Sequence, residues 1–202
     1  MQQLKAFNAD VAHELRTPLA TLIGETEVAL SRERDAPVLR ETLASNLEEM
    51  QRLSALVNDM LFLSQADRGA VARRGEPVSL AELARQVSEF HEATLEDAGV
   101  ALRVDGDAQV AVDVALVKRA LSNLIGNATR FAEPGSTIVV AIAPEADGQL
   151  RVVVENAGQG IAPDHLPRLF DRFFRADSSR CCEEAQHHGL GLAIVAAIAR
   201  MH

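Results

Sequence analysis

Residues 12–18 read Ala-His-Glu-Leu-Arg-Thr-Pro, which places an imidazole directly before a carboxylate. Because the unperturbed pKa of histidine lies near neutrality, His13 can act as a neutral nucleophile at cellular pH. Glu14 is placed to accept the other ring proton and thus to act as a general base. Pro18 has no amide hydrogen, so the carbonyl of Glu14 loses its helical partner and the helix can bend there. The stretch predicts a reactive histidine on a helix; the alternative is a solvated histidine on a surface helix.

Three later patterns are suited to holding a ligand. Asn123 and Asn127 lie four residues apart, so they share one face of a predicted helix. The alternative to a ligand-binding role is that both are merely buried and hydrogen-bonded there. The sequence Glu-Asn-Ala-Gly-Gln-Gly-Ile at 155–161 leaves a predicted strand, and its two glycines let the backbone approach a flat ligand closely. The sequence Gly-Leu-Gly at 189–191 opens a last helix, whose amide groups and dipole favour phosphate.

Together these patterns resemble a known family. Residues 12–18 are similar to the phosphoacceptor box of bacterial sensor histidine kinases. Later segments are similar to that family's nucleotide-binding boxes, in the same order: 123–131, 156–161, 169–175 and 189–191. The resemblance covers essentially the whole chain. It implies that His13 accepts the γ-phosphoryl group of ATP, that Glu14 is the general base, and that Glu14 and Thr17 position the water that dephosphorylates a partner protein.

The same resemblance implies how ATP is held. Asn127 would coordinate Mg²⁺ through its carbonyl oxygen, Asn123 would support the ion through water, and Arg130 would contact phosphate oxygens. A neutral ligand suits Mg²⁺ because the triphosphate already supplies negative charge, and arginine is a permanent cation. Residues 169–175 resemble the base of the ATP lid, and the polar residues 176–188 would form the lid itself. The remaining predicted ATP-binding residues are Asn156, Gly158, Gly160, Arg172, Arg175, Gly189, Leu190 and Gly191.

Two positions depart from the family pattern. Asn156 stands where the family usually has aspartate, and its amide oxygen can still accept a hydrogen bond from the adenine amino group. The Val-Glu-Asn sequence that ends at Asn156 resembles the subfamily of kinases that respond to copper, silver, zinc or cadmium. His187 stands where a further glycine is usual. Cys181, Cys182, His187 and His188 could also suggest a metal site, but their spacing lacks the paired C-x₂-C or H-x₃-H geometry of a closed site.

The reactive histidine lies in the first of two expected helices. Apolar residues recur at helical spacing over residues 4–30 and again over 39–63, where the pattern is close to a heptad seam. A polar stretch with a proline, 31–37, separates the two helices. One helical hairpin cannot enclose a core, whereas two copies make a four-helix bundle. We therefore expect residues 1–66 to form a dimerisation domain that carries the phosphoacceptor.

The rest of the chain predicts a mixed domain after a Gly-, Arg- and Ala-rich linker at 67–77. A capping box at 79–82 opens a predicted helix that runs to about Asp97, and Asp113 can cap a long helix over 114–131. The other expected elements are strands at 100–104, 109–112, 137–143 and 150–155 and a helix at 191–201. Residues 78–202 should thus form an α+β sandwich, with one sheet covered by helices on one face. The resemblance identifies it as a GHKL-type ATP-binding domain with a truncated C-terminal end.

The composition limits which binding partners and which cellular compartment are expected. The formal net charge of −9 argues against nucleic acid as a partner, because a phosphate backbone requires a basic patch. The adjacent Cys181 and Cys182 are poorly placed for a structural disulfide, which favours a reducing compartment. No apolar run reaches the length of about 18 residues that a membrane span needs, and no secretory signal opens the sequence. The resemblance implies the cytoplasmic portion of a bacterial inner-membrane protein, attached to the membrane only through segments absent from this sequence.

The sequence thus predicts the core of a two-component sensor histidine kinase that uses ATP and Mg²⁺. His13 would be phosphorylated, and the phosphoryl group would pass to an aspartate in the receiver domain of a response regulator. A heavy metal is the expected input, on the subfamily resemblance alone. Two alternatives stay open. One is a phosphatase-dominant enzyme that uses Glu14 and Thr17, and the other is a GHKL-type ATPase or scaffold in which His13 is idle.

Overall fold

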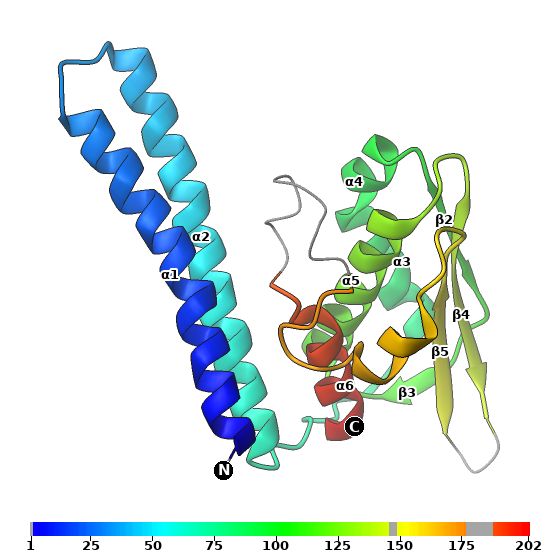
Figure 1. Ribbon diagram of the computed structural model, residues 1–202. Coiled ribbons are helices and arrows are strands. Elements are labelled where there is room, and N and C mark those ends of the chain that lie inside the picture. Colours follow the sequence, from blue (N-terminus) through cyan, green and yellow to red (C-terminus); the bar gives the residue numbers. More distant parts are fainter. Residues whose placement is uncertain (1, 146–148, 177–187) are drawn as a thin grey trace. The chain divides into compact units, whose positions relative to one another are not determined.

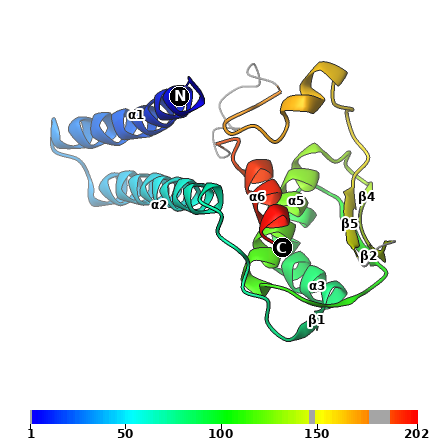
Figure 2. The ribbon, with the colours of Figure 1, turned by 90° about the horizontal axis from the view of Figure 1, so that it is seen from below.

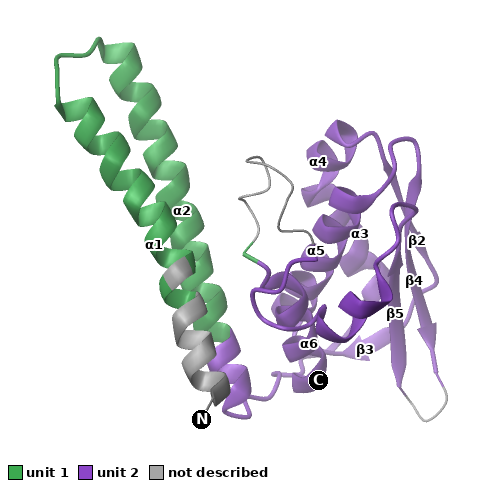
Figure 3. Ribbon diagram, in the orientation of Figure 1, with its two compact units in different colours: residues 1–62, 179–188 green, residues 63–178, 189–202 purple. Residues whose placement is uncertain are grey.

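The computed structural model describes the whole chain except residues 1, 146–148 and 177–187 and the side chains of residues 2–10 and 13. The protein divides into two compact units (Figure 3): residues 1–62 with 179–188, and residues 63–178 with 189–202. The helix α2 (Ala36–Asp67) is continuous across this division, so its last turn belongs to the second unit.

The first unit contains the predicted helical hairpin. α1 (Gln2–Leu30) and α2 run side by side and are joined by a short turn (Figure 1). Less exposed side chains recur along α2 every three or four residues, for example at Asn46, Leu53 and Leu56. Asn46 is only 7% exposed, and its Nδ2 donates to Thr26 Oγ1 of α1 at 3.1 Å. One face of α2 is therefore used within the hairpin.

A set of large apolar side chains of the hairpin remains exposed, and we call it the open face. It consists of Leu19 and Ile23 on α1 and of Leu39, Leu43, Leu47, Met50, Val57 and Leu61 on α2. Leu43 is 67% exposed and Leu61 is 57% exposed. Large apolar side chains gathered on one face are uncommon on the surface of a soluble monomer, and such patches mark interaction sites.

The second unit combines helices with a mixed sheet (Figures 1 and 2). β2 (Ala101–Asp105) runs parallel to β4 (Thr137–Pro144), and β5 (Leu150–Glu155) runs antiparallel to β4. The helices α3 (Leu80–Phe90) and α5 (Val114–Phe131) cover one face of this sheet, and α6 (Gly191–Met201) packs against α5. Ala84 of α3, Ile125 of α5 and Val140 of β4 are fully buried in the shared core. The predicted class, a helical hairpin followed by an α+β sandwich, is confirmed.

The described strands form two sheets, whereas the sequence pattern predicts one. β1 (Pro77–Ser79), which was not predicted, pairs antiparallel with β3 (Gln109–Ala111). Between β2 and β3, Gly106 has a φ of +77°, and a Cβ atom there would lie 2.1 Å from the carbonyl oxygen of Ile142. The chain thus turns away tightly after β2, which only glycine allows at this position, and β3 starts a separate ladder.

The helix predicted from Leu80 to about Asp97 is interrupted at His91, so this prediction is wrong. α3 ends at Phe90, and α4 (Glu92–Asp97) starts again after His91, which has φ −94° and ψ 4°. The break lets the His91 ring reach α5, where Nε2 lies 2.8 Å from Ser122 Oγ. Burial lowers the pKa of His91, which favours the neutral form of the ring. The partner lies far away in sequence, which is why helical periodicity alone missed the break.

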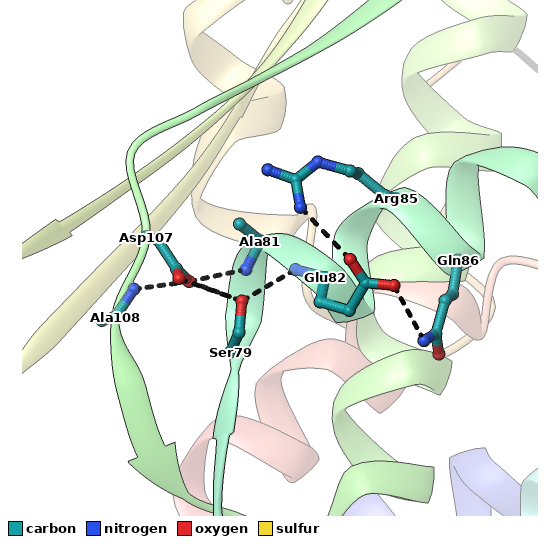
Figure 4. Close-up of polar contacts among 7 residues, drawn as sticks. All are labelled: Ser79, Ala81, Glu82, Arg85, Gln86, Asp107 and Ala108. Carbon is teal, nitrogen blue, oxygen red and sulfur yellow. Dashed lines mark hydrogen bonds and ion pairs between the residues drawn. The ribbon is translucent and has the colours of Figure 1, made fainter.

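Two side chains cap the N-terminus of α3 (Figure 4). Ser79 Oγ accepts the amide hydrogen of Glu82 at 3.0 Å, as the predicted capping box requires. The Glu82 carboxylate is turned along the helix and accepts from Arg85 Nη1 at 3.2 Å. Asp107, from the turn between β2 and β3, accepts from Ser79 Oγ at 2.9 Å and from the Ala81 amide at 3.0 Å. The second cap ties this turn to the start of the helix.

Replacing Asp107 by asparagine is expected to lower the unfolding temperature at neutral pH and to weaken its dependence on acid. The hydrogen bond from the Ala81 amide, followed by those from Ser79 and Ala108, holds the pKa of Asp107 below its ordinary value against a smaller opposing effect of desolvation. A carboxylate whose pKa is lowered by folding stabilises the fold above its unfolded-state pKa. This contribution is lost as the pH falls through the folded-state value.

Thermal unfolding of the wild type and of Asp107→Asn between about pH 7 and about pH 3 measures the effect, and the difference should narrow toward the acidic end. Asp105→Asn is the control, because it removes a nearby exposed carboxylate that pairs with Arg103 Nη2 at 2.9 Å instead of capping a helix. A difference that stays constant over this pH range would show that the charge of Asp107 does not support the cap.

Candidate functional site

The predicted phosphoacceptor stretch lies within α1, and the helix continues through Pro18. The side chain of His13 falls outside the described part of the structure, whereas Glu14 is half-buried and Thr17 is exposed. Thr17 follows His13 by four residues, so the helix backbone places it one turn away on the same face. Because Pro18 has no amide hydrogen, it cannot donate to the carbonyl of Glu14. The helix therefore lacks one backbone hydrogen bond next to His13.

Helix α5 carries the two predicted asparagines. Asp113 caps its N-terminus, with Oδ1 accepting the Leu116 amide at 3.2 Å, as predicted. Asn123 and Asn127 are both half-buried and one turn apart. Asn123 Nδ2 donates to the Arg119 carbonyl at 2.9 Å. That bond turns the Nδ2 end of the amide toward the helix backbone, and the Oδ1 end lies next to Gly191.

The Gly-Leu-Gly turn at 189–191 lies directly against Asn123. A Cβ atom on Gly191 would lie 2.8 Å from Asn123 Oδ1, so glycine lets α6 begin in contact with α5. Leu190 is 2% exposed and anchors the turn, and its carbonyl accepts the Ile194 amide at 2.9 Å. The first amides of a helix have no intrahelical partner and favour anions. The start of α6 therefore adds anion-favouring groups next to the asparagine face.

The glycine loop after β5 meets the other end of α5. A Cβ atom on Gly158 would lie 2.0 Å from the carbonyl oxygen of Phe131 and 3.3 Å from Asn156 Nδ2. Only glycine therefore fits this approach. Arg130 lies over the Phe131 ring, with Cζ 4.3 Å from the ring centroid. Asn156 and Arg130 are both exposed and are brought to the same end of α5. Gly160 has open space at its Cβ position.

The segment 169–175 crosses the turn at 189–191. The Phe173 amide donates to the Gly189 carbonyl at 3.0 Å. Phe173 has a φ of +61°, a left-handed conformation that costs a residue other than glycine roughly 1–2 kcal/mol. Gly189 has a φ of +66°, and a Cβ atom there would lie 2.9 Å from the carbonyl oxygen of Phe174. The crossing holds together the described ends of the predicted lid, whose residues 177–187 lie outside the described part of the chain.

The two predicted phosphate-binding arginines of this segment differ in their surroundings. Arg172 Nη2 lies 2.6 Å and 2.7 Å from the two carboxylate oxygens of Asp67, the last residue of α2. Both residues belong to the second unit. Arg175 is exposed. No pattern around Asp67 in the sequence indicates that it pairs with Arg172.

The structure thus brings together Asn123 with Gly191, Gly158 with Asn156 and the end of α5, and Phe173 with Gly189. Three of the four residues that could suggest a metal site, Cys181, Cys182 and His187, lie outside the described residues. Within the described residues, no group of three or more His, Cys, Asp or Glu side chains could hold a metal ion.

Two family descriptions match the chain. Residues 3–69 match the His Kinase A (phospho-acceptor) domain. Residues 112–202 match the histidine kinase-, DNA gyrase B-, and HSP90-like ATPase family. Among the described helices, none combines the length and the apolar character that crossing a membrane requires.

Named relatives match nearly the whole chain. Sensor histidine kinase CusS of Escherichia coli (strain K12) is 49% identical over 197 residues, which cover 97% of this chain and 41% of that protein. Sensor protein CzcS of Cupriavidus metallidurans is 41% identical over 201 residues, which cover 100% of this chain and 42% of that protein. Sensor protein CopS of Pseudomonas syringae pv. tomato is 39% identical over 189 residues, covering 94% and 38%. The chain therefore spans about two fifths of the length of these relatives.

Solved structures show the same fold. The Acinetobacter baumannii histidine kinase AdeS has a TM-score of 0.73 and 26% identity, over 94% of this chain and 86% of that chain. Full-length ShkA in complex with AMPPNP has a TM-score of 0.68 and 28% identity, over 96% of this chain and 40% of that chain.

Proposed function

Because this chain belongs to the histidine kinases, we propose that it is the catalytic core of a two-component sensor that phosphorylates itself on His13. The phosphoryl group then passes to an aspartate in the receiver domain of a response regulator. The observation that carries the proposal is the contact of Gly191 with Asn123, because it builds an anion-favouring helix start beside an asparagine face. The match to an ATPase family supports ATP as the phosphoryl donor, and the AMPPNP complex of ShkA supports it further.

The residues of the second unit fit a magnesium–nucleotide complex. Asn123 Oδ1 and Asn127 offer neutral oxygens, which suit a hard cation that is already surrounded by phosphates. Arg130 supplies permanent positive charge for phosphate oxygens. Asn156 offers an amide oxygen to the adenine amino group, at the end of α5 where Gly158 admits a close approach. When bound, Mg²⁺ would neutralise charge on the phosphates during transfer.

The chemical step uses His13 as the nucleophile. One imidazole nitrogen forms the bond to the γ-phosphorus, while the bond between that phosphorus and the β–γ bridging oxygen breaks and ADP leaves. Glu14 accepts the proton of the other ring nitrogen and so raises the nucleophilicity of the attacking one. The receiver aspartate then takes the phosphoryl group from His13. In the opposing reaction, the dephosphorylation of the response regulator, Glu14 and Thr17 would position the attacking water.

A label-transfer assay with γ-labelled ATP and Mg²⁺ tests the proposal. The wild-type chain should acquire a label that is labile in acid and stable in base. Hydrolysis of ATP without any label on the protein would favour the alternative of a GHKL-type ATPase in which His13 is idle.

We also propose that the open face of the hairpin pairs with a second copy, and we expect the chain to be a homodimer. Light scattering should give twice the single-chain mass of 21.8 kDa. Leu43→Glu places a charge on the open face, where Leu43 is 67% exposed, and should yield monomers. Phe90→Glu is the control, because Phe90 is 82% exposed but lies on α3 in the second unit. A monomeric wild type with the hairpin intact would contradict the bundle.

We also propose the signal that this kinase senses and the compartment in which its core acts. The Val-Glu-Asn sequence at 154–156 supports a heavy metal as the input, because it resembles the metal-responsive subfamily. The relatives named as sensors are longer than this chain, which supports sensing by segments outside this sequence. We propose the cytoplasmic side of a bacterial inner membrane as the place where this core acts.

A further inference from the structure

Arg172, a predicted ligand of the ATP phosphates, lies in an ion pair with the last residue of α2. Its Nη2 is 2.6 Å from Oδ1 and 2.7 Å from Oδ2 of Asp67. The carboxylate therefore occupies a guanidinium nitrogen that could otherwise donate to a phosphate oxygen. The side chain of Arg172 is 27% exposed and that of Asp67 is 51% exposed. A competing anion can therefore reach the pair.

The backbone of Arg172 is fixed close to the proposed phosphate site. Its neighbour Phe173 donates to the Gly189 carbonyl at 3.0 Å, in the left-handed conformation described above. Gly189 is followed after one residue by Gly191, which contacts Asn123. Both anchors hold the main chain, so the guanidinium can change partners while its backbone stays in place.

We propose that Asp67 is a positioning residue that holds Arg172 while the nucleotide site is empty, and that the ATP phosphates compete with it for the guanidinium. The inference rests on the proposed ATP binding. Because α2 is one continuous helix from Ala36 to Asp67, the helix that forms the hairpin also carries this competing carboxylate at its end. A shift of this end relative to the lid base would change the affinity for ATP.

Asp67→Asn tests the competition, because it keeps the shape of the side chain and removes its charge. Calorimetric titration with Mg²⁺ and a nonhydrolysable ATP analogue should show binding about two- to fivefold tighter than in the wild type, the range that a partly exposed ion pair supports. Adenosine has no phosphate, so it should bind the wild type and the variant equally.

Asp171→Asn is the matched control. It removes the same charge from the same segment as Arg172, but Asp171 pairs with Arg168 Nε at 3.6 Å and should not compete for Arg172. In an Arg172→Gln background, Asp67→Asn should have no further effect, because the shared partner is gone.

Unchanged or weaker binding of the ATP analogue by Asp67→Asn would overturn the competition. Equal tightening in Asp171→Asn would also overturn it, since a general charge effect would then suffice. If the wild type bound no ATP analogue at all, the proposed ATP binding itself would be wrong. Equal binding of the analogue by the wild type and by Asp67→Asn would instead contradict only the competition.

Discussion

Replacing His13 by alanine is expected to abolish phosphorylation of the protein by ATP and to leave nucleotide binding near the wild-type level. His13 lies on α1 in the first unit, whereas Asn123, Asn127 and Gly191 belong to the second. The change removes the acceptor nitrogen without altering any residue that is proposed to hold ATP. Transfer of label from γ-labelled ATP, measured beside titration with an ATP analogue, separates the two effects. A stable label on the variant would place the acceptor elsewhere in the chain.

Thr17→Ala is the matched control for that experiment. Thr17 is exposed one turn from His13 on the same helix, so its loss should change stability by less than about 0.5 kcal/mol. Self-phosphorylation should persist, because the Thr17 hydroxyl has no proposed role in the attack of His13 on ATP. Dephosphorylation of the partner regulator should slow, because the hydroxyl is proposed to orient the attacking water. Equal loss of both rates in a folded variant would indicate that Thr17 acts through the geometry of the helix.

The helices that carry the site could be predicted because their signals are local. Asp113 followed by an apolar repeat predicted the helix over 114–131, and the structure has it with these bounds and with the predicted cap. The spacing of Asn123 and Asn127 then places both on one face of that helix. Gly158 and Gly191 also lie in recognisable local motifs. In the structure, a Cβ atom at Gly158 would clash with the carbonyl oxygen of Phe131, and one at Gly191 would clash with the amide oxygen of Asn123.

The parts that escaped prediction depend on contacts between distant segments. The break at His91 accompanies a contact with Ser122 on another helix. The ion pair of Arg172 with Asp67 joins residues that are far apart in the sequence, and no local pattern links the two. The left-handed conformation of Phe173 is unusual for its residue type, and its hydrogen bond to Gly189 becomes visible only in the folded chain. Local propensity carries no information on such pairings.

Replacing Asn127 by alanine is expected to remove the magnesium dependence of ATP binding. The hard cation would lose the one protein oxygen proposed to coordinate it directly, and altering a metal site typically costs about 10- to 100-fold in affinity. Calorimetry with a nonhydrolysable ATP analogue, with Mg²⁺ present and then with the ion chelated, measures the change. The wild type should lose affinity on chelation, whereas Asn127→Ala should bind weakly in both conditions.

Ser122→Ala provides the comparison on the same helix, because Ser122 is also half-buried and its Oγ lies 2.8 Å from His91 Nε2. It should leave magnesium-dependent binding intact, even if the lost hydrogen bond lowers the unfolding temperature. Circular dichroism of both variants separates misfolding from loss of the ligand. Unchanged affinity of folded Asn127→Ala in the presence of Mg²⁺ would mean that other oxygens hold the ion, and the asparagine face of α5 would then have only a packing role.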